Sequence, residues 1–194
     1  MDRPPAAPDL EFYPLAPGRW PDLVALFEHH GNPGYCWCMT WRLTAAAYQR
    51  LTSAGRREAL KALVALGTPI GILAYQAGEP IGWCSIAPRA TCQRLEESTV
   101  LRRLDDMPVW SVVCFFVKRE QRGQGVSLAL LKAAVAYARS QGAQVIEGYP
   151  VEPDQSYRFM GAPSIFEQAG FHVAAVVRGR RGARSIMRLR VDGA

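Results

Sequence analysis

Residues 109–127 read VWSVVCFFVKREQRGQGVS, and this stretch decides the fold. In its first nine residues, 109–117, Ser111 is the only strongly polar side chain. Such a run predicts a strand that is buried on both faces, in the middle of a sheet. Apolar residues then recur at helical spacing over 126–140, and Gly142 lies just beyond as a C-cap. The stretch therefore predicts a strand, a glycine-containing turn and a helix.

The elements around this unit predict an α/β domain with three layers. A further strand over 144–149 follows the helix, and a crossover of this length requires the two strands to be parallel. Strands and helices together predict a mixed sheet of six or seven strands with helices on its faces. Gly55 is a candidate break within the second helical segment. The other expected strands are 10–15, 69–75, 80–87, 171–177 and 185–191, and the other expected helices are 23–27, 45–66, 94–104 and 163–169.

The composition limits the classes of protein to which the chain can belong. With 194 residues, 49% of them apolar, the chain is expected to form a flexible tail over 1–9 and one domain over 10–194. No apolar run is long enough to span a membrane, and the start lacks the layout of a secretory signal. The five cysteines are odd in number and scattered, which is not a disulfide framework. These features predict a cytoplasmic protein in a reducing compartment.

The basic excess suggests an anionic partner. The net charge is +6, and arginines crowd the last segment and the region around 118–122. Such a distribution suits a phosphorylated cofactor, an acidic substrate or nucleic acid. Nucleic acid is the weakest of these, because no recognition helix or aromatic–basic interleaving accompanies the arginines.

The turn between the buried strand and the long helix indicates a phosphate site. In RGQGVS, residues 122–127, the glycines allow a sharp turn whose N–H groups are not covered by side chains. These donors add to the unpaired N–H groups of the first helical turn, at the positive end of the helix dipole. A pyrophosphate fits such a cradle, with Arg122 beside it. The turn lacks the Lys-Ser/Thr ending of a P-loop and the three-glycine spacing of a dinucleotide fold.

This turn resembles the Q/R-x-x-G-x-G/A signature of the GCN5-related N-acetyltransferases, the GNAT superfamily. Residues 166–171, FEQAGF, are similar to the closing Y/F-E-x-x-G-F segment of the same family. The resemblance covers roughly 10–191 and implies a sheet that splays between its fourth and fifth strands. It also implies direct transfer of an acetyl group, in a ternary complex, from acetyl-CoA to a primary amine of a small molecule or a protein. The residues that it assigns to the coenzyme are Phe115, Phe116, Val117, Arg122, Gly123, Gln124, Gly125, Val126 and Ser127.

The sequence departs from the family pattern at two positions. Ser127 stands where the signature has Gly or Ala, a change that leaves its N–H in place. Phe166 stands where many members have a tyrosine that protonates the departing coenzyme thiolate, and phenylalanine has no proton to give. We therefore take Tyr157, in the loop between the predicted fifth strand and the last predicted helix, as the candidate acid. Glu147 is the candidate base, because burial on the predicted fifth strand raises the pKa of a carboxyl group.

The stretch YCWCMTW, residues 35–41, is the most unusual in the chain. The resemblance places this region beside the acceptor, so Tyr35, Trp37 and Trp41 are expected to line the acceptor pocket. Aromatic walls suit an apolar or cationic acceptor. An alternative for this stretch is a zinc site formed by Cys36 and Cys38 with Cys84 and Cys92. The C-x-C spacing and the lack of a second tight pair argue against zinc, and no metal is expected.

Two expectations remain open from the sequence. Because Phe166 lacks the hydroxyl, a non-catalytic CoA-binding regulatory module is the alternative to an N-acetyltransferase. The partners expected are acetyl-CoA and an amine acceptor, with neither membrane nor nucleic acid, and a homodimer is left open.

Overall fold

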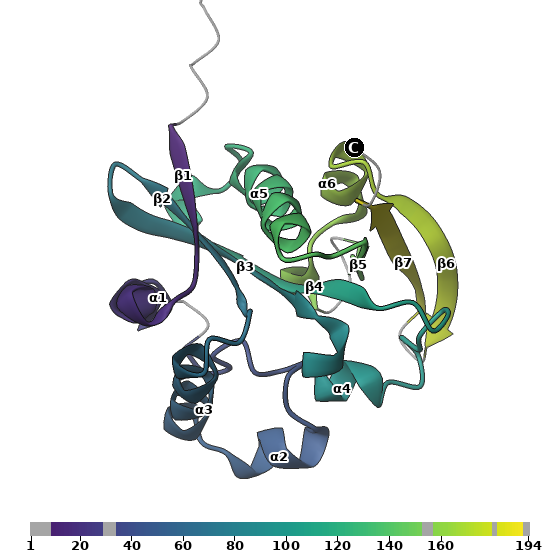
Figure 1. The fold of residues 1–194 in the computed structure, drawn as a ribbon, viewed down its shortest axis with the longest axis horizontal. Helices are drawn as coiled ribbons and strands as arrows, with labels where there is room; N and C mark the ends of the chain where they lie inside the picture. Colours follow the sequence, from purple (N-terminus) through teal and green to yellow (C-terminus); the bar gives the residue numbers. More distant parts are fainter. Residues whose placement is uncertain (1–8, 29–33, 153–156, 180–181, 192–194) are drawn as a thin grey trace, which may run out of the picture.

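A computed structural model describes residues 9–28, 34–152, 157–179 and 182–191 (Figure 1). The predicted tail over 1–9 lies outside these residues except for Asp9, and the extent of the domain stays a prediction. None of the described helices has the length and apolarity needed to cross a bilayer. The strands are β1 (Leu10–Pro14), β2 (Gly71–Gln76), β3 (Glu79–Pro88), β4 (Val109–Val117), β5 (Val145–Gly148), β6 (His172–Gly179) and β7 (Gly182–Arg190), and the helices are α1 (Trp20–Glu28), α2 (Ala45–Arg50), α3 (Ser53–Ala65), α4 (Gln93–Glu96), α5 (Val126–Ser140) and α6 (Pro163–Gln168).

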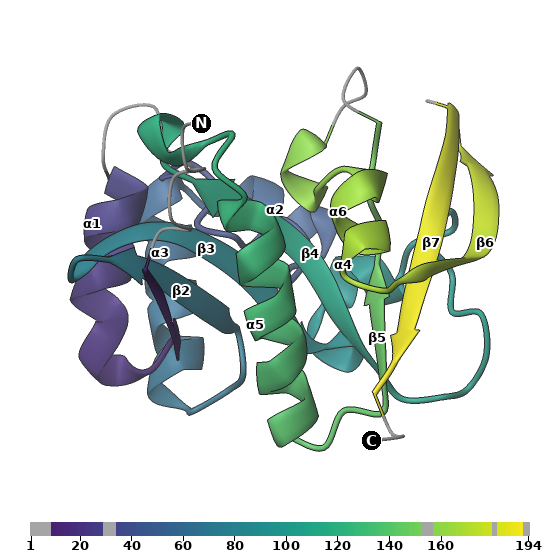
Figure 2. The ribbon, with the colours of Figure 1, turned by 90° about the horizontal axis from the view of Figure 1, so that it is seen from above.

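The described strands form one mixed sheet in the order β1-β2-β3-β4-β5-β7-β6. All neighbours are antiparallel except β4 and β5, which are parallel and joined by the crossover helix α5. Helices α5 and α6 cover one face, while α1 and α3 lie on the other (Figures 1 and 2). The expected mixed α/β sheet flanked by helices is confirmed.

Most predicted elements appear, with two local corrections. The segment over 45–66 does break into two helices, but at Leu51 and Thr52, and Gly55 lies inside α3. The Thr52 side chain accepts a hydrogen bond from the Gly55 N–H at 3.2 Å, so Thr52 is the N-cap that begins the new helix. The expected helix over 94–104 is shorter, since α4 ends at Glu96.

Strands β4 and β5 pair for only four residues, from Val109–Val145 to Val112–Gly148. The next residues of the β5 segment are Tyr149 and Pro150, and a proline has no N–H to continue a ladder. On its other side, β4 pairs Val112 with Ile86 and Cys114 with Ser85, which leaves Val113 as an extra residue in a bulge. The two irregularities coincide. Strand β4 therefore loses its β5 neighbour at the bulge, where the regular alternation of its side chains between the two faces of the sheet is interrupted.

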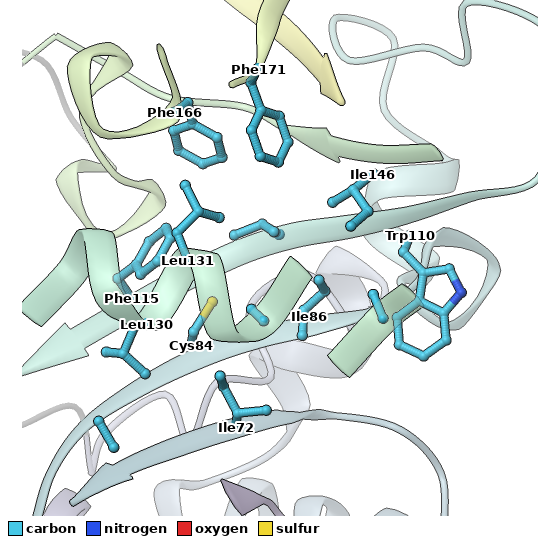
Figure 3. Packing of buried hydrophobic residues seen from close by; sticks show 14 of the residues in the cluster. Ile72, Cys84, Ile86, Trp110, Phe115, Leu130, Leu131, Ile146, Phe166 and Phe171 are labelled. Atoms are coloured by element: carbon cyan, nitrogen blue, oxygen red, sulfur yellow. The ribbon is translucent and has the colours of Figure 1, made fainter. Parts of the chain in front are cut away.

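A phenylalanine from α6 lies directly over the end of β5. A Cβ atom added at Gly148 would lie 2.0 Å from Phe166 Cε1, so only glycine fits under this ring. Phe166 is fully buried and packs edge-on against Phe115 of β4 and Phe171, with ring centroids 6.0 and 5.2 Å away (Figure 3). Its apolar contacts hold α6 against both parting strands.

A buried charge cluster joins the same strands on the opposite face. The Glu147 carboxylate, 1% exposed, accepts hydrogen bonds from Arg89 (3.3 Å), Arg188 (2.8 Å) and the Tyr149 hydroxyl (2.7 Å). Ser111 Oγ lies 2.8 Å from that hydroxyl. Burial and the neighbouring carboxylate hold the pKa of Tyr149 well above its usual value, so the hydroxyl keeps its proton and donates it. The cluster therefore links β4, β5 and β7 to Arg89, which follows β3.

We expect Gly148→Ala to lower the free energy of unfolding by about 1–3 kcal/mol, because its methyl group overpacks the site that Phe166 occupies. Urea denaturation measures the change. Gly18→Ala is the matched control, since a Cβ at Gly18 meets nothing within 4 Å. Equal stability of the two variants would contradict the packing of Phe166 over β5.

We expect Glu147→Ala to cost about 3–5 kcal/mol of unfolding free energy, because it removes a carboxylate from two arginines in a buried site. Glu167→Ala, at an exposed position of α6, should change stability by less than about 0.5 kcal/mol. A loss below about 1 kcal/mol for Glu147→Ala would mean that the cluster is not a structural support.

Candidate functional site

A cavity of about 640 Å³ opens where β4 and β5 part. Four segments line it: the loop over 35–41, the end of β4 over 113–117, the glycine turn with the start of α5, and residues 158–165 before and within α6. The cavity therefore gathers the two stretches that the sequence singled out, 35–41 and 122–127, on either side of one strand.

The predicted coenzyme residues of β4 all line this cavity. Phe115, Phe116 and Val117 are among its walls, and on the side where β5 has ended their main chain has no strand neighbour among the described residues. The N–H and C=O groups of such an edge are ready to pair with another extended chain. Pantetheine carries two amide groups on an extended chain, so it suits this edge.

The glycine turn has the geometry that the sequence predicted. Gly123 and Gly125 have φ values of 75° and 78°, a left-handed conformation that favours glycine, and a Cβ at either would meet nothing within 4 Å. Arg122 Nε donates to the Val117 carbonyl at 3.1 Å, which ties the turn to β4. Arg122 and Ser127 line the cavity. The turn thus presents open backbone at the N-terminus of α5, where an anion is favoured.

The remaining two residues of the turn have other surroundings. Val126 is 2% exposed and packs in the core under α5, so its side chain anchors the helix start and only its N–H is available to a ligand. Gln124 is exposed, and its side-chain amide donates to the Glu120 carbonyl at 3.0 Å.

The aromatic loop divides between the cavity and the core. Tyr35, 66% exposed, and Trp41, 7% exposed, line the cavity, and their role beside the acceptor stays a prediction. Trp37 does not: it is 2% exposed and packs against Trp20 and Phe27, with ring centroids 6.0 and 5.6 Å away. The expectation that Trp37 lines the acceptor pocket is not supported, because its ring is part of the core beneath α1.

Neither residue proposed for proton transfer lies on the cavity wall. Glu147 belongs to the buried charge cluster, where two arginines hold its carboxylate, and it does not line the cavity. Tyr157 contacts Trp41 and Phe159, which do line the cavity, with ring centroids 6.1 and 5.6 Å away. Proton transfer by Glu147 and Tyr157 stays a prediction that the lining of the cavity does not favour.

The cavity instead brings together three cysteines that the sequence did not assign to transfer. Cys36 and Cys38 come from the aromatic loop, and Cys114 comes from β4 directly after the bulge. Among the described residues, no Asp, Glu, His or Lys side chain lines the cavity. The C-x-C spacing drew attention to this loop, but the partner across the sheet is not visible in a one-dimensional pattern.

Arg158 also lines the cavity and was not singled out from the sequence. It is exposed, and it begins the short 3-10 turn Arg158–Met160 that leads into α6. In the part of the chain that the structure describes, no three His, Cys, Asp or Glu side chains are grouped so that they could hold a metal ion.

A family model supports the resemblance. The model described as the acetyltransferase (GNAT) family matches residues 25–159. No protein with a curated description matches the chain in sequence.

Solved structures share the fold over nearly the whole chain. A polyamine N-acetyltransferase from Drosophila melanogaster, which forms N-acetylagmatine, has a TM-score of 0.59 at 13% identity and covers 94% of this chain and 100% of its own. The aminoglycoside acetyltransferase AAC(6')-Ib with coenzyme A has a TM-score of 0.58 at 19% identity, covering 94% and 95%.

A third solved structure adds a bound cofactor. A putative acetyltransferase from Salmonella typhimurium with acetyl-CoA has a TM-score of 0.56 at 17% identity, covering 95% of each chain. These likenesses establish the fold, and the family model, which matches more than half of the sequence, establishes the family. Together with the parting of β4 from β5 and the glycine turn at α5, they show that the chain belongs to the GNAT acetyltransferase family.

Proposed function

We propose that this protein transfers an acetyl group from acetyl-CoA to a primary amine of a small molecule or a protein, by direct attack in a ternary complex. The observation that carries the proposal is the meeting, in one cavity, of the unpaired edge of β4 and the glycine turn at the start of α5. One feature suits an extended amide chain and the other suits a pyrophosphate, and acetyl-CoA contains both groups.

The coenzyme is proposed to lie along β4 with its phosphates at the turn. Backbone N–H groups from Gly123 to Ser127 face the pyrophosphate, and the Arg122 guanidinium beside them supplies positive charge. The pantetheine pairs with the main chain of Phe115 to Val117 as an added strand. This arrangement directs the thioester toward the bulge at Val113, deep in the cavity.

Transfer requires that the thioester carbonyl be polarised and the amine be aligned. The bulge frees backbone groups of β4 at the point where β5 has ended. A backbone N–H aimed at the developing oxyanion stabilises the transition state, and removal of one such donor costs other enzymes about 10²–10³-fold in kcat. Holding both substrates in one cleft adds the advantage of proximity.

The acceptor side is proposed to be the space between Tyr35, Trp41 and Arg158. Aromatic walls favour an acceptor with an apolar or cationic body, whereas Arg158 favours an anionic group on it. The similar structures act on agmatine in one case and an aminoglycoside in another. A panel of these two amines and a peptide with a free N-terminus is therefore the first test of activity, with thiol release from acetyl-CoA as the readout.

A second candidate function is a non-catalytic CoA-binding module. The observation in its favour is Phe166, which is fully buried and has no proton to donate. Thiol release in the presence of an amine separates the two functions, because a binding module would bind acetyl-CoA without turnover. We also propose a reducing, cytoplasmic setting, since all five cysteines are free and buried. Assembly as a homodimer stays a prediction.

We expect Ser127→Glu to weaken acetyl-CoA binding by at least about tenfold, because like charges a few ångströms apart near a protein surface repel by about 1–4 kcal/mol. A carboxylate in the first turn of α5 suits the helix dipole, so the variant should fold. Calorimetry measures the affinity, and Ser127→Ala is the matched control with wild-type affinity. Unchanged affinity in folded Ser127→Glu would exclude the turn as the pyrophosphate site.

We expect Trp41→Ala to raise the KM of the amine by about tenfold or more, the scale of lost contacts in an apolar pocket, with little change in acetyl-CoA affinity. Trp37→Ala should instead lower the unfolding free energy by about 3–5 kcal/mol, because Trp37 is core. Steady-state kinetics and urea denaturation of both variants check the division. Similar kinetic losses for both would mean that the loop acts as one packing unit.

A further inference from the structure

The proposed transfer releases one proton from the amine and requires one at the coenzyme sulfur. Among the described residues of the cavity wall, the titratable side chains other than the arginines are Tyr35 and the cysteines Cys36, Cys38 and Cys114. Tyr35 lies at the rim, and partial burial raises the pKa of its hydroxyl further above neutrality. The proton therefore has to pass through a cysteine or through water.

Cys38 has the contacts of an anion. Its Sγ accepts a hydrogen bond from Trp83 Nε1 at 3.3 Å, and the neighbouring Cys114 thiol lowers its pKa. The side chain is 4% exposed, the residue is part of the cavity wall, and its backbone is left-handed with φ of 55°. Trp37 before it is also left-handed, at 47°. Non-glycine residues are held in this region only when the surroundings enforce it, and such strain clusters at functional sites.

Arg42 is a buried cation that needs a counter-charge. It is 3% exposed and donates to the Ile70 carbonyl at 2.7 Å and to Ser85 Oγ at 3.1 Å, both uncharged acceptors. Its Nε has no partner, and no carboxylate of the described residues forms an ion pair with it. A buried charge is stable only when it is paired. Cys38 is the candidate for that partner, because the charge of Arg42 lowers the pKa of its thiol.

The neighbouring cysteines titrate in the opposite direction. The hydrogen bond from Cys114, the charge of Arg42 and the donors Trp83 and Ser85 together lower the pKa of Cys38 to about 6, against the effect of burial. Burial raises the pKa of Cys36 to about 11 and that of Cys84 well above its usual value. The hydrogen bond with Cys38 and burial do the same for Cys114. The pKa of Cys38 is thus lowered, while the pKa values of Cys36, Cys84 and Cys114 are raised.

We propose that Cys38 is a thiolate paired with Arg42 and that it carries the proton from the amine to the departing coenzyme. The inference rests on the proposed function. As the amine nitrogen attacks the thioester carbon, an N–H proton passes to Cys38 Sγ, the C–S bond breaks and the electron pair leaves on the coenzyme sulfur. The Cys38 thiol then gives the proton to that sulfur, which releases free CoA and restores the thiolate. Cys38 thus acts first as base and then as acid, and Phe166 needs no hydroxyl.

A titration of the free protein tests the ionisation without any substrate. Thiolate absorbance in the ultraviolet, measured on wild type and on Cys38→Ser, should differ by one thiolate that appears with a midpoint near pH 6. In Arg42→Gln this step should move to higher pH, because the stabilising cation is gone. A wild-type protein without a thiolate step below about pH 8 would overturn the proposal, since an ordinary thiol ionises above that value. The titration of the wild-type protein gives this answer whether or not the variants fold.

Kinetics test the role in transfer. With the best amine of the panel, Cys38→Ser should lower kcat by about 10²-fold or more and lose the acidic limb near pH 6, while acetyl-CoA affinity stays within about twofold. Cys92→Ser, at a buried position that does not line the cavity, is the control with wild-type kcat. Wild-type kcat and pH profile in Cys38→Ser would overturn the proton role even if the thiolate is present. Failure of wild type to bind acetyl-CoA or release thiol would instead overturn the proposed function, whatever the titration shows.

Discussion

The short pairing of β4 with β5 is the constraint on which the rest of the molecule depends. Four residue pairs join the strands before Pro150 ends the ladder and the bulge at Val113 redirects β4. On one face Phe166 packs over Gly148, and on the other the Glu147 cluster fixes the paired part. Apolar contacts and buried charges thus hold the same opening from its two sides.

The arrangement explains why the charged and the reactive groups are kept apart. Glu147 has two arginines around it and serves the framework, so its carboxylate is neutralised where it is buried. Arg42 has only uncharged acceptors and a sulfur nearby, so it acts on the group that faces the cavity. Arg89 and Arg42 are both buried. Because their partners differ, Arg89 stabilises the framework, whereas Arg42 acts on Cys38.

The sequence predicted best where local pattern and tertiary role agree. The apolar run of β4 and the helical stripe of α5 have both ends as expected, because burial on two faces and amphipathic spacing leave little freedom. The glycine turn was predicted from its glycines and from its place between these two elements. The positions of side chains were harder to predict. Glu147 and Arg89 form an ion pair although they are 58 residues apart in the chain. Trp37 lies in the core and Trp41 lies on the cavity wall, and the backbone is left-handed at Trp37 and Cys38. Neither fact is encoded in a periodicity.

The central claim is that the opening between β4 and β5 is the acetyl-CoA site. A crystal structure of the protein with bound coenzyme A tests it most directly. We expect pyrophosphate oxygens within hydrogen-bond distance of the N–H groups of residues 123–127, pantetheine paired with Phe115 to Val117, and the coenzyme sulfur beside Cys38. Coenzyme bound elsewhere, or bound with its sulfur outside the cavity, would contradict it.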